Sequence, residues 1–279
     1  MQGNEQRRRE AMKNLERELG RRDRAEKAKP LGVVVATLAI LVALVGGIWF
    51  LTTMGDDEED VTASETETTS PAEATPLAMA RSEALPDTVT CEYPAGGGEA
   101  AKEISTPKTD GVSTTGTVTV TLKTNRGDVP MELDRSLSPC AVNAIEHMAK
   151  EGYYDDTVCH RMTEGILNVL QCGDPTGSGA GGPGFTFADE YPKDQPDAPA
   201  EVVYPAGSIA MANSGPDTNG SQFFLNFADS RLQPNYSALG SMTPEGLEVV
   251  KGISEKGIEG GQPDGAPAEE VRIESATVS

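Results

Sequence analysis

Short stretches in which apolar and polar residues alternate dominate the chain from residue 116 onward. The clearest is TVTVTLKT at residues 117–124, where valine or leucine occupies every second position up to residue 122. A period of two indicates a β-strand with one buried face. Comparable runs, separated by glycine, proline, asparagine and aspartate, are VPMELD, TVCHRM, NVLQC, SIAMAN, QFFLNF and EVRIESATV.

Only two stretches of this region have helical spacing. The first is expected to begin after the N-cap residue Ser138, with Pro139 at its first position, and the second after Thr243, with Pro244 at its first position. Many strands with two isolated helices predict an all-β domain over residues 116–279, built as a closed barrel with helices over its open ends.

The longest apolar stretch is LGVVVATLAILVALVGGIWFLTTM, residues 31–54, which contains no charged residue. A helix of about 20 apolar residues spans a bilayer, whereas the apolar part of a signal peptide has only about 7–15 residues. We therefore expect a transmembrane helix over 31–54. Residues 1–30 hold ten Lys and Arg against six Asp and Glu, and DDEED follows the apolar stretch. The positive-inside rule then makes 1–30 a cytoplasmic charged segment and places the rest outside the cytoplasmic membrane, as a single-pass protein.

Residues 55–115 are rich in Glu, Thr, Ser, Ala and Pro and contain little that could be buried. Such a composition does not offset the conformational entropy lost on folding, so we expect a disordered extracytoplasmic linker. All four cysteines, Cys91, Cys140, Cys159 and Cys172, lie on the external side. Four cysteines allow three disulfide connectivities, of which we favour Cys91–Cys140 and Cys159–Cys172. Strict strand alternation opposes the second pair, unless a bulge intervenes.

The net charge of −21 excludes an electrostatically driven nucleic-acid partner, because an acidic domain repels phosphate backbones. A zinc site is not expected, because the chain has only two histidines and no CxxC motif. We predict no other metal and no cofactor.

Three blocks carry more information than composition does. They are CHRM followed by VLQCGD, then GSGAGGPGFTFADE, then GSIAMANSGPDTNGSQFFLNF. In this order they resemble the signature blocks of the cyclophilins, a family of peptidyl-prolyl cis-trans isomerases, over about residues 116–278. The resemblance is strongest to membrane-tethered bacterial members. It implies an eight-stranded antiparallel barrel capped by two helices and an activity that uses neither metal nor cofactor.

The chemistry of that activity accounts for an arginine in a short strand. An X–Pro bond resists rotation because the prolyl nitrogen shares its lone pair with the carbonyl group. Rotation localises the lone pair, so a fixed hydrogen-bond donor favours the twisted state over either planar isomer. Arg161 suits this role because its guanidinium stays charged and holds its donors in a rigid fork.

The resemblance assigns further residues by position. It implies that Gln171 holds Arg161, that Gln171 and Gln222 bind the substrate backbone, and that Phe224 forms the floor of the proline pocket. We therefore predict Arg161, Gln171 and Phe224 as catalytic residues. The predicted substrate-binding residues are Leu167, Val169, Ala212, Asn213, Gln222, Leu232, Tyr236 and Leu239.

The sequence departs from the family pattern in the proline pocket. Asn168 stands where a phenylalanine is usual, Leu239 replaces a second aromatic residue, and Leu232 falls where a tryptophan or its neighbouring leucine is expected. Two extra residues in MTEGILN also lengthen the preceding loop. Either Leu167 or Ile166 fills the pocket and Asn168 points to solvent, which we favour, or Asn168 lines the pocket and weakens it.

We expect an isomerase that assists the folding of newly exported proline-containing polypeptides at the outer face of the cytoplasmic membrane, and that is a monomer. The alternative is a membrane-tethered proline-peptide-binding module or chaperone with little turnover. Arg161 favours the isomerase, and Asn168, with the aromatic area that the pocket has lost, favours the binding module.

Overall fold

The structure, a computed structural model, describes residues 74–196 and 198–279. The predicted cytoplasmic segment, transmembrane helix and first part of the linker lie outside these residues. Within the part of the chain that is described, the helices are too short or too polar to cross a bilayer.

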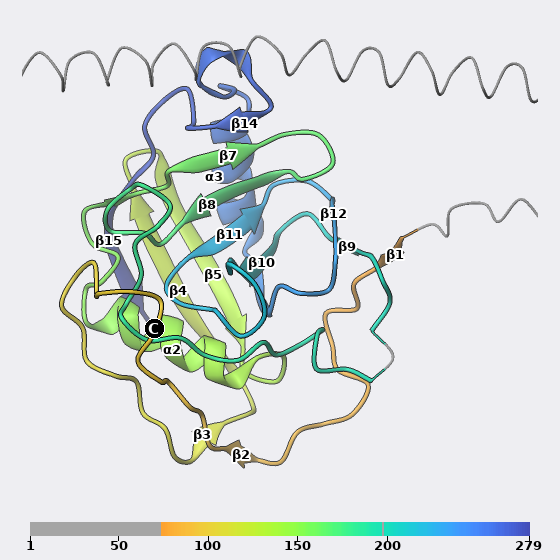
Figure 1. The fold of residues 1–279 in the computed structure, drawn as a ribbon. Coiled ribbons are helices and arrows are strands. Elements are labelled where there is room, and N and C mark those ends of the chain that lie inside the picture. The colour runs from red at the N-terminus through yellow and green to blue at the C-terminus, as the bar shows by residue number, and fades with distance from the viewer. Residues whose placement is uncertain (1–73, 197) are drawn as a thin grey trace, which may run out of the picture. The chain divides into compact units, whose positions relative to one another are not determined.

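A ten-stranded antiparallel sheet forms the framework (Figure 1). Its strands, in order across the sheet, are β14 (Asp264–Gly265), β7 (Arg161–Thr163), β8 (Val169–Cys172), β11 (Phe223–Asn226), β10 (Ser208–Met211), β13 (Ala238–Met242), β5 (Gly127–Asp134), β4 (Thr117–Thr124), β15 (Arg272–Val278) and β6 (Thr157–Val158). In β4 the predicted alternation is confirmed, because Val118, Val120 and Leu122 are buried whereas the threonines between them are less enclosed.

The closed eight-stranded barrel of the sequence prediction is not what the strand pairing shows. The sheet curls as a half-barrel with an open strand order, and β6 and β7 are successive parts of one chain segment. The ladder is interrupted between them at Cys159 and His160, where the segment leaves β15 and joins β8. This break also removes the alternation problem, and the disulfide Cys159–Cys172 is confirmed.

Both predicted helices are confirmed. Helix α2 (Pro139–Lys150) packs against β4, β5 and β15, and helix α3 (Pro244–Ser254) packs against β5 and β13. The Thr243 hydroxyl accepts a hydrogen bond from the Gly246 N–H, as an N-cap residue does. Ser138 forms no such bond; the carboxylate of Glu190 accepts the N–H groups of Cys140 and Ala141 instead.

The buried side chains form two clusters on opposite faces of the sheet. The main core lies between the sheet and the helices and includes Val120, Ile145, Met162, Phe223 and Leu225. A smaller cluster centres on Phe224. Beside it lies a three-stranded sheet of β1 (Thr75–Pro76), β9 (Val202–Tyr204) and β12 (Ser230–Leu232). The remaining elements are β2 (Thr88–Val89), β3 (Val112–Ser113) and the 3-10 helix η1 (Glu259–Gly261).

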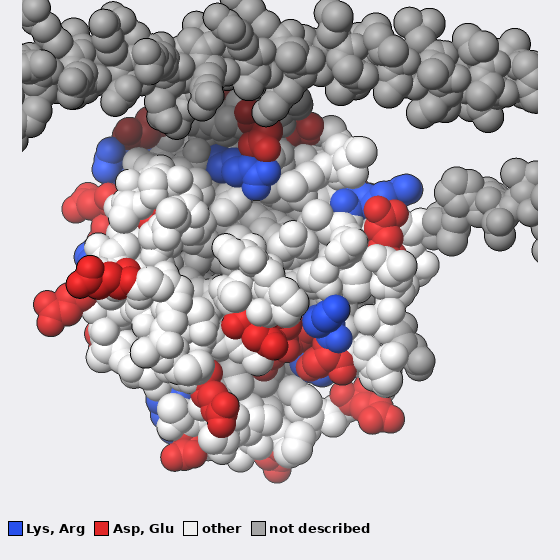
Figure 2. Space-filling view, viewed as in Figure 1, with Lys and Arg blue, Asp and Glu red and all other residues white. Residues whose placement is uncertain are grey.

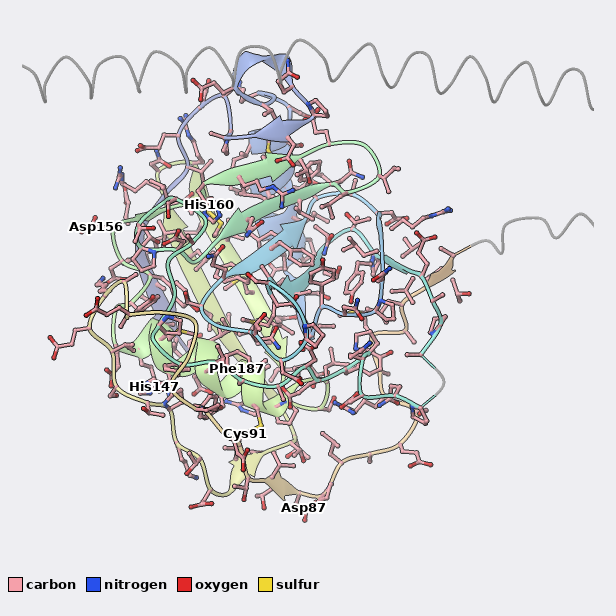
Figure 3. The ribbon with its side chains drawn as sticks, viewed as in Figure 1. Asp87, Cys91, His147, Asp156, His160 and Phe187 are labelled. Carbon is pink, nitrogen blue, oxygen red and sulfur yellow. A yellow bond between two sulfur atoms is a disulfide. The ribbon has the colours of Figure 1, made fainter. Side chains whose placement is uncertain are left out.

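Residues 74–115 differ from the expected disordered linker, because they pack against the rest of the domain. The disulfide Cys91–Cys140, which the sequence favoured, fixes this segment to α2. Figure 3 labels Cys91 and Phe187, and the ring of Tyr93 packs edge-on against Phe187. The Arg81 guanidinium donates hydrogen bonds to the Leu137 carbonyl oxygen at 2.7 and 2.9 Å. A few such anchors suffice to order a segment whose overall composition is polar.

Candidate active site

The three predicted catalytic residues lie side by side on one face of the sheet. Arg161 on β7 is directly opposite Gln171 on β8, and Gln171 is directly opposite Phe224 on β11. Residues opposite each other in neighbouring strands point to the same face. The register therefore places the guanidinium, the amide and the aromatic ring in one row.

A chain of hydrogen bonds links these polar groups. Arg161 donates from Nη1 to Gln171 Oε1 at 3.1 Å, and Gln171 donates from Nε2 to Gln222 Oε1 at 2.9 Å. Gln222 in turn donates to the carbonyl oxygens of Gly179 and Gly181, each at 3.0 Å. The glycine-rich loop at residues 177–182 thus fixes the side chain of Gln222. Gln222 fixes Gln171, and Gln171 fixes the guanidinium of Arg161.

Asp264 is a partner of Arg161 that the sequence analysis missed. Its two carboxylate oxygens accept hydrogen bonds from Arg161 Nε and Nη2, both at 2.8 Å. This contact raises the pKa of Arg161 and lowers the pKa of Asp264, so both groups are charged at neutral pH. The two residues are 103 positions apart in the chain, and no local pattern around Asp264 marks it as a site residue.

An apolar cluster adjoins the polar row. Phe224, only 5% exposed, forms the centre of the smaller cluster, together with Val169. The predicted substrate-binding residues Leu167, Ala212, Leu232 and Tyr236 are partly buried against this cluster. The rings of Phe224 and Tyr236 meet edge to face, with 5.6 Å between centroids, so an aromatic pair remains despite the departures from the family pattern.

Leu239 does not belong to the Phe224 cluster, and its prediction as a substrate-binding residue is wrong. It is 1% exposed and lies in the main core. The ladder between β10 and β13 is irregular here: Ala210 pairs with Ala238, whereas Ile209 pairs with Gly240. Leu239 is the extra residue of this bulge, so the core, and not the groove, receives its side chain.

The side chain of Asn168 forms hydrogen bonds with the backbone in and beside the loop between β7 and β8. Its side chain accepts a hydrogen bond from the Gly165 N–H and donates to the carbonyl oxygens of Gly165 and Asp229, at 2.8–2.9 Å. Leu167 packs against the Phe224 cluster, whereas Ile166 is 76% exposed. Leu167 therefore supplies the apolar contact, as we favoured, but Asn168 fastens the loop instead of pointing freely to solvent.

A pocket of about 260 Å³ lies beside the amides of Gln171 and Gln222. The glycine-rich loop lines one side of it and Asn213, another predicted substrate-binding residue, lines the other. Asn213 donates from Nδ2 to the Asn235 carbonyl oxygen at 2.8 Å, which fixes its side chain. Gly97 also lines this pocket; it belongs to the segment expected to be disordered, and its contribution could not be predicted.

Apart from Arg161 and Asp264, the residues placed at the site are uncharged. Figure 2 shows one face with acidic side chains, and fewer basic ones, mostly toward its edges and uncharged residues over most of the area between them. His160, labelled in Figure 3, follows Cys159 at the break between β6 and β7. Burial lowers the pKa of His160, so at neutral pH the ring adds no charge beside Arg161.

Comparison with known proteins agrees with this geometry. A sequence model of the family described as "Cyclophilin type peptidyl-prolyl cis-trans isomerase/CLD" matches residues 119–278. The probable peptidyl-prolyl cis-trans isomerase B of Mycobacterium leprae is 45% identical over 194 residues, which cover 67% of this chain and 66% of that protein. Its namesake in Mycobacterium tuberculosis is 44% identical over 192 residues, which cover 66% and 62%. The chain thus matches slightly less than two thirds of these relatives' length.

A solved cyclophilin-type isomerase of Cryptosporidium parvum, crystallised in the presence of the dipeptide Ala-Pro, is 30% identical. The match covers 58% of this chain and 98% of that chain, with a TM-score of 0.47.

The alignment with the M. leprae protein covers more of the chain than residues 119–279 can supply, so it includes part of the preceding segment that packs on the domain. The family match itself covers more than half of the chain. The chain belongs to the cyclophilin-type peptidyl-prolyl cis-trans isomerase family.

Proposed function

We propose that the chain catalyses the cis–trans isomerisation of X–Pro bonds in polypeptides. The observation that carries the proposal is the row of Arg161, Gln171 and Phe224, in which a charged donor stands next to a cluster of apolar side chains. We infer that a proline ring packed against Phe224 brings its peptide bond toward the guanidinium of Arg161.

Arg161 has donors left for this task. Arginine carries five N–H groups, and Asp264 and Gln171 engage three of them. Among the described residues, the other two, one on each terminal nitrogen, have no partner. A donor already held in place loses little freedom when the prolyl nitrogen becomes a better acceptor in the twisted state, so it lowers the barrier to rotation.

The alternative is a proline-peptide-binding module with little turnover. One argument for it was that Asn168 lines the proline pocket and weakens it. The side chain of Asn168 instead forms hydrogen bonds with the backbone of Gly165 and Asp229, so this argument no longer applies. Leu232, which is smaller than the tryptophan that the family pattern allows at this position, still reduces the apolar area available to bind a proline.

Turnover of a proline peptide decides between the two functions. We expect the purified full-length chain to accelerate isomerisation, and Arg161→Ala to lower kcat/KM by about 100- to 1000-fold, the usual effect of removing one electrostatic donor. Arg126→Ala is the matched control, because Arg126 forms an ion pair with Glu269 at 2.6 Å outside the row. Peptide binding without turnover, or full activity of Arg161→Ala, contradicts the proposal.

We further propose that the domain acts on exported proteins outside the cytoplasmic membrane, tethered by residues 31–54. Two disulfides support an oxidising location, and the charge difference across the apolar stretch supports the orientation. Protease added to intact cells should release the domain by cleaving between residue 56 and about residue 73. Full protection of the chain until the membrane is disrupted contradicts this orientation.

A further inference from the structure

Two residues form hydrogen bonds with the guanidinium of Arg161 from opposite sides. In the sheet, β14 lies on one side of β7 and β8 on the other. Asp264 on β14 binds the Nε and Nη2 edge of the guanidinium, and Gln171 on β8 binds Nη1. Because both edges of the planar guanidinium are bonded, it cannot rotate freely at the end of the flexible arginine side chain.

The backbone fixes the carboxylate of Asp264 in turn. Asp264 pairs with Thr163 and Gly265 pairs with Met162 in the short ladder between β14 and β7. The Glu164 N–H donates to the Pro263 carbonyl oxygen at 2.9 Å beside that ladder. Arg161 is two residues before Thr163 on the same strand, so it is the diagonal neighbour that a long side chain reaches.

We propose that Asp264 is a positioning residue for prolyl isomerisation: it orients the guanidinium of Arg161 so that its two remaining N–H groups meet the prolyl peptide bond. This inference rests on the proposed function, and it deepens that function by naming what holds the catalytic arginine.

A structural role explains the ion pair poorly. The side chains of Arg161 and Asp264 are 40% and 54% exposed, and ion pairs at such exposure contribute little to folding stability. The carboxylate also opposes catalysis by weakening the positive potential of Arg161. In a well-solvated pair that effect is no more than a few-fold, whereas displacing a catalytic group by about 1 Å can cost about 100-fold. Orientation is therefore the larger effect.

Three variants of the full-length chain test the proposal. We expect Asp264→Ala to lower kcat/KM for a proline peptide by about tenfold, mainly through kcat, with an unchanged melting temperature. Asp264→Asn keeps one acceptor oxygen and should recover most of the loss. Glu259→Ala is the control; it removes a charge from the same loop, and among the described residues its side chain makes no hydrogen bond or ion pair.

A nuclear magnetic resonance measurement separates this inference from the proposed function. The Nε–H signal of Arg161 should exchange slowly with water in the parent chain and in Glu259→Ala, but rapidly in Asp264→Ala. Unchanged exchange in Asp264→Ala overturns the positioning role even if the chain shows no turnover. Equal or higher kcat in Asp264→Ala, with Arg161 essential, overturns it as well and leaves the isomerase function intact.

Discussion

Replacing Asn168 by alanine should weaken substrate binding through the loop that presents Leu167. The change removes three side-chain hydrogen bonds to the backbone of residues 165 and 229. Each is worth about 0.5–1.5 kcal/mol net. Because all three are partly exposed, the lower end applies, and the order of the loop loses roughly 1.5 kcal/mol of stabilisation in total. Leu167 is then presented correctly for only part of the time, and the apparent affinity falls by that fraction.

We expect KM for a proline peptide to rise about three- to tenfold in Asn168→Ala, with kcat nearly unchanged because Arg161 is not touched. Leu167→Ala should raise KM to a similar extent, since it removes the apolar contact itself. Ile166→Ala is the matched control, because this side chain is 76% exposed in the same loop. The reasoning is refuted if Asn168→Phe raises kcat/KM severalfold while Leu167→Ala has no effect, which is the behaviour of a pocket-lining asparagine.

Two further predictions concern stability. Burial raises the pKa of Glu190 to about 7 from 4.5, against the N–H groups of Cys140 and Ala141 that favour its charged form. Protonated Glu190 therefore stabilises the folded chain fully below the pKa of its unfolded state, and this stabilisation is lost as the pH rises through about 7. The free energy of unfolding should fall by up to about 3 kcal/mol between pH 5 and 8. Denaturant titrations of Glu190→Gln should not show this fall. Replacing Cys159 and Cys172 by alanine should lower the free energy of unfolding by roughly 3 kcal/mol, and a loss below about 0.5 kcal/mol in the same titration would show that the disulfide does not constrain this hairpin.

Local patterns predicted most of the framework. The period of two in β4 and the proline-led starts of α2 and α3 are properties of contiguous residues, so a single sequence displays them. The same holds for Arg161 and Gln171, because a short hairpin, in which the two residues are ten positions apart, brings their side chains onto one face. Even the two extra residues of the loop left this register intact.

The segment from residue 74 to 115 shows where composition misleads. Its average polarity predicts disorder, yet order depends on a few contacts and not on the average. Arg81 donates hydrogen bonds to the Leu137 carbonyl oxygen in the β5–α2 connection, and Tyr93 packs edge-on against Phe187. Cys91 is covalently bound to Cys140 of α2. Each contact joins residues that are at least 49 positions apart, which a linear pattern does not reveal.

The two remaining errors, Leu239 and Asp264, have one physical cause. Both depend on how distant strands are aligned, and that alignment is set by single-residue irregularities. One bulged residue in β13 sends Leu239 into the main core and leaves Ala238 beside the pocket. A two-residue ladder brings Asp264 beside Arg161 across 103 positions. A shift of one residue in that ladder would turn the carboxylate to the other face. The residue that we propose to position Arg161 is therefore one that no periodicity could have identified.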